Sequence, residues 1–423
     1  MRDIAKVIFK LKARIRDFAG SLCSGLSGAA SRAISDVLYG LCKGGDVKLT
    51  CIGRGLREKI GLKKAVERLS RNLSREDFSR SLNRRLVEIS AGRIEADTLL
   101  VIDESDVQKR YARAMEHLGP VRDGSEGKIG RGYPCMNVLA TEVDGGDVMP
   151  LWGSLYSVRS ETCGGQNAEI TWAFRDILER LDGRGIWVMD RGFDRARLLK
   201  ELLALKAQFV VRLEGNRGLR FRRSEALASE IRVAMRHLAQ VVLVKNGRRR
   251  VKNIEYGIVD VKLPFSEAPL SLVKFRFQKG IQTFLILTNV QLGRSGKDLL
   301  WVVKAYLSRW RIEEQNRFIK QSYNLEDIRI RSYNGLRNMT ALVTACAAFV
   351  SGVVGLKPTL RILANKLLHA SHRVGDFIKD FRCYALADGL KALLALTNKP
   401  WREPTPPPSP QLPLIFPTLR GLR

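Results

Sequence analysis

The chain is long, rich enough in apolar residues to fold, and strongly basic. Its 423 residues carry 73 Lys and Arg against 43 Asp and Glu, a formal net charge of +30, and 45% of them are hydrophobic. Such a composition supports a substantial core and excludes a disordered basic tail. So large a charge predicts a polyanionic partner, with nucleic acid as the first candidate and a membrane surface as the weaker one.

The first 90 residues predict a helical, basic region. They hold 20 Lys and Arg against 9 Asp and Glu, and apolar residues recur with helical spacing over 4–18, 29–41 and 65–89. The last of these segments is expected to break near 72–74, where Ser74 with Asp77 resembles a capping box. We therefore expect a helical DNA-binding domain over 1–90, with a merely solvated amphipathic bundle as the alternative.

Residues 97–213 alternate between strand and helix patterns. Strands are expected at 97–106, 136–143 and 148–157, with a turn at 144–147 between the last two. A helix at 168–181, a strand at 186–190, a helix at 193–205 and a strand at 208–215 follow. This order predicts a mixed sheet with helices packed on its faces, the first part of an α/β core.

The rest of the chain predicts an insertion, a return to the core and a helical end. Residues 214–280 are expected to form a β-rich basic insertion, since positions 211–255 carry 12 Lys and Arg against 4 acids and 254–263 and 270–277 have strand patterns. A strand at 283–290 and a long helix at 296–322 supply the second part of the core, 281–345. A helical C-terminal region, 346–399, precedes a tail, 400–423, that holds eight of the 14 prolines and is expected to be disordered.

Two features bear on the compartment. The seven cysteines are scattered and odd in number, which argues against a disulfide framework or a zinc finger and favours a reducing cytoplasm. The stretch from 339 to 356 lacks charge and is long enough to be tested as a membrane span. Its Thr, Ser and Gly content favours a core helix, so we expect no membrane association.

Two carboxylates follow apolar strands, and a third lies on a patterned helix. Asp103 and Asp190 end buried strands, where a carboxylate needs a partner or a metal ion, although either alone is more often a cap or turn residue. Asp106 competes with Asp103 for the role. At roughly 100° per residue Tyr306, Arg309, Glu313 and Lys320 fall at about 0°, 300°, 340° and 320°.

That stripe favours Glu313 over its neighbour. On the same projection Arg317 falls beside Tyr306 and could join the stripe, whereas Glu314 falls well off it. A solvent-facing helix with i,i+4 ion pairs is the alternative reading. Three carboxylates from distant positions could instead hold two Mg²⁺ ions for phosphodiester chemistry, with the cationic side chains and the Tyr306 hydroxyl on DNA phosphates.

With these motifs the chain resembles a bacterial insertion-sequence DDE transposase, of the insertion sequence 4 type with a Tyr-x2-Arg-x3-Glu-x6-Lys signature. The signature matches Tyr306, Arg309, Glu313 and Lys320, and the segments VIDES and VMDRGFDR match at Asp103 and Asp190. The resemblance spans about 97–345. It implies an RNase H-like core, with Asp103, Asp190 and Glu313 as catalytic residues and as ligands of two Mg²⁺ ions, for which Mn²⁺ would substitute.

The resemblance also implies an activity and partners. A DDE transposase of this kind moves a DNA element by cut and paste, through strand cleavage and 3′-hydroxyl strand transfer on double-stranded element ends and target DNA. Tyr306, Arg309 and Lys320 would contact DNA phosphates near the cleavage site, with Arg317 a further candidate. Phe284 would stack on a flipped base, although a strand phenylalanine is more often core.

The resemblance further implies a homodimer on paired ends, in contact through the region after 340, in a bacterial cytoplasm. Two other functions remain open from the sequence. One is an RNase H-like structure-specific nuclease, which cleaves without strand transfer. The other is an inactive DNA-binding regulator derived from a transposase, against which the three intact acids argue.

Overall fold

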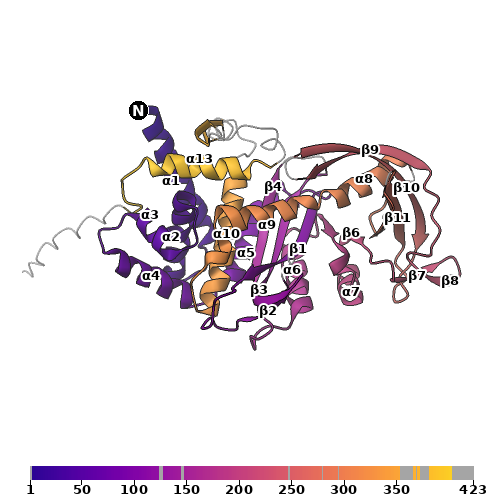
Figure 1. The fold of residues 1–423 in the computed structure, drawn as a ribbon, viewed down its shortest axis with the longest axis horizontal. Helices are drawn as coiled ribbons and strands as arrows, with labels where there is room; N and C mark the ends of the chain where they lie inside the picture. Colours follow the sequence, from indigo (N-terminus) through magenta and orange to yellow (C-terminus); the bar gives the residue numbers. More distant parts are fainter. Residues whose placement is uncertain are drawn as a thin grey trace, which may run out of the picture.

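The computed structural model describes residues 2–122, 127–143, 147–245, 248–278, 280–293, 295–352, 365–367, 369–371 and 381–402. Over these ranges a mixed ten-stranded sheet extends from a helical N-terminal region to a β-rich end that its own outer strands form (Figure 1). The predicted α/β fold class, a mixed sheet with helical regions at both ends, is confirmed. Residues 144–146 of the expected turn at 144–147, most of 353–380 and residues 403–423 of the expected tail lie outside the described residues.

The core of the sheet forms where apolar runs predict strands. Its elements are β1 (Leu99–Gln108), β2 (Gly119–Arg122), β3 (Ile129–Thr141), β4 (Val148–Leu155), α6 (Gln166–Arg180), β5 (Ile186–Met189), α7 (Ala196–Ala204) and β6 (Gln208–Arg212). β1 pairs antiparallel with β3 and parallel with β5, which pairs parallel with β6. The short edge strand β2 is an addition to the expected order, because its Gly119-Pro120 start reads as a turn.

The strands of the expected insertion continue the same sheet. They are β7 (Gly218–Phe221), β8 (Ser224–Leu227), β9 (His237–Lys245), β10 (Arg248–Val261), β11 (Leu270–Phe277) and β12 (Thr283–Thr288). β12 pairs with β6, and β11, β10 and β9 follow outward, whereas β7 and β8 form a separate hairpin. The basic segment 248–277 is thus joined edge to edge to the strands that flank Asp190.

The N-terminal region consists of helices, several of which pack against the buried helix α10 (Tyr333–Gly352). The helices of this region are α1 (Arg2–Leu22), α2 (Gly28–Gly44), α3 (Leu49–Leu56), α4 (Leu62–Ser74) and α5 (Ser79–Ser90), packed with α10 and α13 (Cys383–Ala395). The expected break lies between α4 and α5, but the expected capping box is wrong. Ser74 bonds to the Ser332 hydroxyl, and the amide of Asn338 accepts from the Phe78 N–H instead.

The uncharged stretch after 339 is a core helix, as predicted. The residues of α10 are buried against α2, α4, α5 and β4, and none of the described helices is both long and apolar enough to span a bilayer. Packing within the chain already covers residues 340–351, so the expected dimer contact after 340 would have to use other residues of that region. Residues 353–356 of the stretch lie outside the described part.

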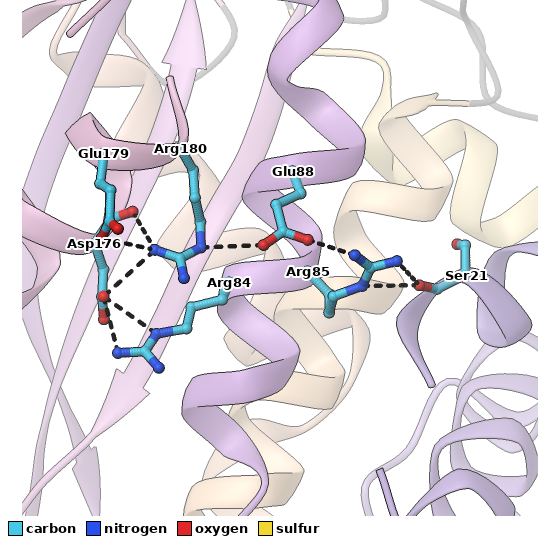
Figure 2. Close-up of polar contacts among 7 residues, drawn as sticks. All are labelled: Ser21, Arg84, Arg85, Glu88, Asp176, Glu179 and Arg180. Atoms are coloured by element: carbon cyan, nitrogen blue, oxygen red, sulfur yellow. Dashed lines mark hydrogen bonds and ion pairs between the residues drawn. The ribbon is translucent and has the colours of Figure 1, made fainter. Parts of the chain in front are cut away.

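Ion pairs tie the helical region to the core along α5 (Figure 2). Arg84 donates to Asp176 on α6 at 2.9 Å, and Arg180 of α6 lies 3.2 Å from the carboxylate of Glu88 on α5. On the other side of α5, Arg85 donates to the Ser21 carbonyl at the end of α1 at 3.2 Å. The network therefore links α1, α5 and α6 through one helix.

The expected long helix at 296–322 is divided. It forms α8 (Gly296–Leu307) and α9 (Trp310–Ser322), and the short turn η3 (Leu325–Asp327) leads on to α10. The Ser308 hydroxyl lies 2.9 Å from both the Lys304 and the Val143 carbonyl oxygens. Such bonding of a serine to the preceding turn bends helices. The bend places Tyr306 at the end of α8 and Arg309 at the start of α9.

Candidate active site

Three elements bring the predicted acids to one region of the sheet. Asp103 lies on β1, Asp190 follows β5 directly, and Glu313 lies in the first turn of α9. β1 continues to Gln108, so Asp103 does not end its strand as expected. β1 and β5 are parallel neighbours with Val101 opposite Val188, and the same register sets Asp103 level with Asp190, just beyond the end of β5. α9 contacts both β1 and β3, which carries Glu313 to the same region.

Asp103 is electrostatically coupled to the other two acids. Burial raises its pKa to about 7; Arg309 lowers it, and the negative charges of Glu313 and Asp190 raise it further. Asn316 of α9 donates from Nδ2 to the Oδ2 of Asp103 at 3.1 Å. The carboxylates of Asp103, Asp190 and Glu313 thus lie within electrostatic range of one another. The amide of Asn316 holds the carboxylate of Asp103 in place.

Asp190 is surrounded by donors. Its Oδ1 accepts from the Arg191 N–H at 2.8 Å and from the Tyr306 hydroxyl at 3.3 Å, and it lies 3.7 Å from Nη1 of Arg212. Burial and the charge of Asp190 raise the pKa of Tyr306, so this hydroxyl stays a donor at neutral pH. Asp190 is therefore held in place as an acceptor.

Arg309 lies between two of the acids. Its Nη2 is 3.8 Å from Oδ2 of Asp190 and also contacts Oε1 of Glu313, and its side chain is only 16% exposed. Burial disfavours its charge, but Asp190 and Glu313 more than offset this and raise its pKa. Arg309 therefore supplies a fixed positive charge among the carboxylates.

The two adjacent glutamates of α9 have different surroundings. The Glu313 side chain is 52% exposed and faces Arg309. Glu314 is buried, forms an ion pair with Arg317 at 2.7 Å, and accepts from the Tyr384 hydroxyl at 3.1 Å. Glu313 is thus the glutamate that faces the other acids, and Arg317 is turned toward Glu314 rather than toward Asp103 or Asp190.

The remaining candidates lie around this cluster. Lys320 is 3.5 Å from Asp106 and 3.1 Å from Glu326, two turns along α9 from Glu313. Asp106, expected beyond the strand, lies within β1. Phe284 is half-buried and stacks on Phe275 with ring centroids 4.6 Å apart. The Arg212 guanidinium lies 4.8 Å from the Phe284 ring, so this aromatic borders the Asp190 surroundings.

Comparison with known proteins identifies a family for the region that holds the three acids. Residues 99–349, which carry all three acids, match the family described as Transposase DDE domain. The chain belongs to this family. It is also similar to the piggyBac transposase in the cryo-EM structure of its synaptic complex with hairpin DNA, at 11% identity and a TM-score of 0.41, over 86% of this chain and 78% of that chain. No curated protein sequence matches the chain.

DDE transposases as a family depend on divalent metal ions, which raises the question of whether the acids of this transposase-family chain fit one. Among the described residues, no three His, Cys, Asp or Glu side chains are close enough together to form a coordination site. The donor chemistry does fit, because three coupled carboxylates are the ligands that hard divalent cations prefer. In this structure the charge of Arg309 offsets them.

Sequence reasoning missed two side chains at the site. Asn316 falls next to Arg309 on the helical projection, so the periodicity of α9 contains its signal. It is buried, and it accepts a hydrogen bond from Asn137 of β3 at 2.9 Å while it donates to Asp103. Arg212 ends β6 and reaches Asp190 only because β6 pairs beside β5, a contact that no local pattern indicates.

Proposed function

We propose that this chain is a DNA transposase that excises and integrates an insertion sequence by cut and paste. The observation that carries the proposal is the coupling of Asp103, Asp190 and Glu313, from three elements, around Arg309. A structural ion pair needs one acid for one arginine. Three acids gathered on one buried arginine favour a site that accepts a second source of positive charge.

Asp103, Asp190 and Glu313 would hold divalent cations, with Mg²⁺ and two ions as our specific proposal and Mn²⁺ as the substitute. Bound there, such ions would supply activation of the attacking hydroxyl and stabilisation of the leaving oxygen in an in-line phosphodiester displacement. The chain's own contribution is positional. Asn316 orients the Asp103 carboxylate, and the Arg191 N–H and the Tyr306 hydroxyl orient that of Asp190.

The basic side chains around the acids would face the DNA. Arg309, Tyr306 and Lys320 are proposed to contact phosphates around the scissile bond. We add Arg212, which contacts both Asp190 and Tyr306. Arg317 and Phe284 remain candidates, but each would have to leave a partner, Glu314 and Phe275 respectively. Double-stranded element ends and target DNA are the proposed partners, in a homodimer in the bacterial cytoplasm.

A cellular excision assay separates this function from its alternatives. A marker flanked by the DNA that borders the coding region is placed beside the expressed chain. A transposase removes the marker and reinserts it with short target duplications. Asp190→Ala should abolish both events. Asp182→Ala, which removes an acid whose side chain is 87% exposed, should leave them intact. Cleavage without reinsertion would favour the nuclease, and DNA binding without cleavage would favour the regulator.

A further inference from the structure

Two loops distant in the sequence enclose a groove beyond the candidate active site. One loop, 109–118, joins β1 to β2, and the other, 324–332, joins α9 to α10. The space between them is about 690 Å³, and its lining includes Arg110, Tyr111, Arg113, Arg329 and Arg331. We call this space the loop groove. Its size is within the range of sites that hold ligands rather than single ions.

The walls of the loop groove are fixed at both ends. At one end the Lys109 ammonium donates to the carbonyl oxygens of Glu326 and of Ile328, the latter at 2.7 Å. At the other end the Glu116 N–H donates to the Arg331 carbonyl at 3.0 Å, and the Glu116 carboxylate accepts from the Tyr333 N–H at 2.7 Å. Because both loops are pinned, the groove is already formed before any ligand binds, which lowers the entropic cost of binding.

The arginines of the groove face solvent. In the second loop Ile328 and Ile330 are buried, and they alternate with Arg329 and Arg331, which are exposed. Alternation in an extended segment places the isoleucines in the core and both guanidinium groups on the other side. Arg113 of the first loop is exposed as well. Within the described part of the chain, none of these three arginines forms an ion pair with an acid.

The acids that line the groove do not neutralise it. Glu326 forms an ion pair with Lys320 at 3.1 Å, and Asp327 forms one with Lys48. Each of these lysines also contacts a second acid, and Asp327 lies within electrostatic range of Arg329. The lining nevertheless holds more cationic side chains than its two acids, so the groove keeps a net positive charge. Guanidinium groups that remain unpaired and solvated bind phosphate without first breaking an ion pair.

Lys320 connects the loop groove to the candidate active site. It contacts Asp106 of β1 on one side and Glu326 of the groove lining on the other. Tyr111 in the first loop is 94% exposed, which offers an aromatic face of the kind on which nucleic-acid bases stack. An aromatic face among arginines suits nucleic acid better than an acidic polypeptide.

We propose that the loop groove holds the phosphodiester backbone of the DNA strand that passes Lys320 on its way from the candidate active site. This inference rests on the proposed function, because it names the surface that carries the substrate. Arg329 and Arg331 would each contact one phosphate, with Arg113 opposite them.

The test is a salt titration of DNA binding by the full chain. A labelled duplex from the boundary of the coding region is bound in EDTA, so that cleavage does not interfere. Arg329→Gln with Arg331→Gln should reduce the slope of log K against log salt by roughly 1.8, since each phosphate contact contributes about 0.9. Arg329→Lys with Arg331→Lys should keep the wild-type slope, because the charge remains.

The matched control removes two charges that lie before the amino-terminal ends of strands in the sheet. Arg93 and Lys206 are exposed and precede β1 and β6, so Arg93→Gln with Lys206→Gln should leave the slope unchanged. Thermal unfolding of every variant shows whether it is folded. A double glutamine variant of the groove with the wild-type slope, or a control that loses as much, overturns the inference.

Two further outcomes keep the inference apart from the proposed function. If the wild-type chain excises the marker but the double glutamine variant of the groove keeps the wild-type salt slope, the groove inference alone is wrong. If the wild-type chain neither binds the duplex nor excises the marker, the proposed function is wrong and the groove inference with it. Loss of polyglutamate binding with an unchanged DNA slope would assign the groove to an acidic polypeptide and also overturn the inference.

Discussion

Asn316 donates a hydrogen bond from its Nδ2 to the Oδ2 of Asp103 at 3.1 Å, and so joins α9 to β1 at the candidate active site. Its Oδ1 accepts from Asn137 of β3, which fixes the orientation of the amide. We predict that Asn316→Ala lowers metal-dependent cleavage about 10–100-fold, as for other side chains that orient ligands.

Asn316→Asp should be worse still, because it removes the donor and adds a like charge beside Asp103. Steady-state cleavage over a series of Mg²⁺ concentrations measures both effects, and the apparent metal affinity should fall together with the rate. Gln321→Ala, an exposed position on the same helix, is the control. Equal losses in the two alanine variants would mean that α9 is merely destabilised.

The two glutamates of α9 should separate activity from stability. Glu313→Gln is expected to reduce cleavage to background while the chain keeps its fold, because the Glu313 side chain is half-exposed. Glu314→Gln is expected to retain cleavage and to lose about 1–3 kcal/mol of unfolding free energy, since it removes the charge of a buried side chain that pairs with Arg317 and accepts from Tyr384. Cleavage assays and thermal unfolding of both variants check this; the reverse pattern would show that Glu314 is the catalytic acid.

Asn338 should control the junction of α4 and α5. Its side chain, 0% exposed, accepts from the Phe78 N–H at 2.9 Å and donates to the Leu73 and Glu76 carbonyls. Asn338→Leu leaves these buried groups unpaired, so a loss of about 2–5 kcal/mol is expected.

Thr340→Val is the matched control, because Thr340 is similarly buried on α10 but its hydroxyl donates only to the carbonyl of Leu336 in its own helix. Urea unfolding gives the two free energies, and the control should lose no more than about 1 kcal/mol. Similar losses for both variants would contradict a special role for Asn338.

Lys109 should give the fold a pH-dependent stability. Burial lowers its pKa to about 8, against 10.5 for a free lysine. The unfolded chain therefore binds more protons between these two values, and the contribution of Lys109 to the unfolding free energy rises with pH through that window. Below pH 8 both states carry the proton and the contribution is constant.

The difference in unfolding free energy between the wild type and Lys109→Met should accordingly increase in favour of the wild type by up to about 3 kcal/mol from pH 7 to pH 10.5. Lys64→Met, at an exposed position on α4, should show a constant difference. Urea titrations at several pH values provide the comparison. A constant difference for Lys109→Met as well would show that its ammonium is solvated.

The fold class and much of the strand order follow from local patterns. Continuous apolar runs such as residues 99–102 and 186–189 are buried strands, as their composition indicates. What could not be predicted depends on partners far along the chain. The α4–α5 junction is held by Asn338, about 260 residues later, and the division of α8 from α9 involves a bond from Ser308 to Val143.

The same division applies to the site. Helical periodicity singled out Glu313 over Glu314, and the structure places these side chains in different surroundings. Periodicity also included Arg317, whose pairing with Glu314 depends on which rotamer packing allows. Arg212 had no local signal, because only the pairing of β5 with β6 brings it to Asp190. Periodicity in the sequence predicts which residues share a face of a helix or strand. It does not predict which other elements pack against that face.

The central claim is that Asp103, Asp190 and Glu313 hold the metal that drives DNA cleavage, and a change of ligand tests it most directly. Cysteine in place of aspartate supplies a soft thiolate, which binds Mg²⁺ poorly and softer divalent ions better. We predict that Asp103→Cys and Asp190→Cys bind DNA normally, fail to cleave it with Mg²⁺, and regain cleavage with Mn²⁺. Full cleavage by either variant with Mg²⁺ would contradict the account.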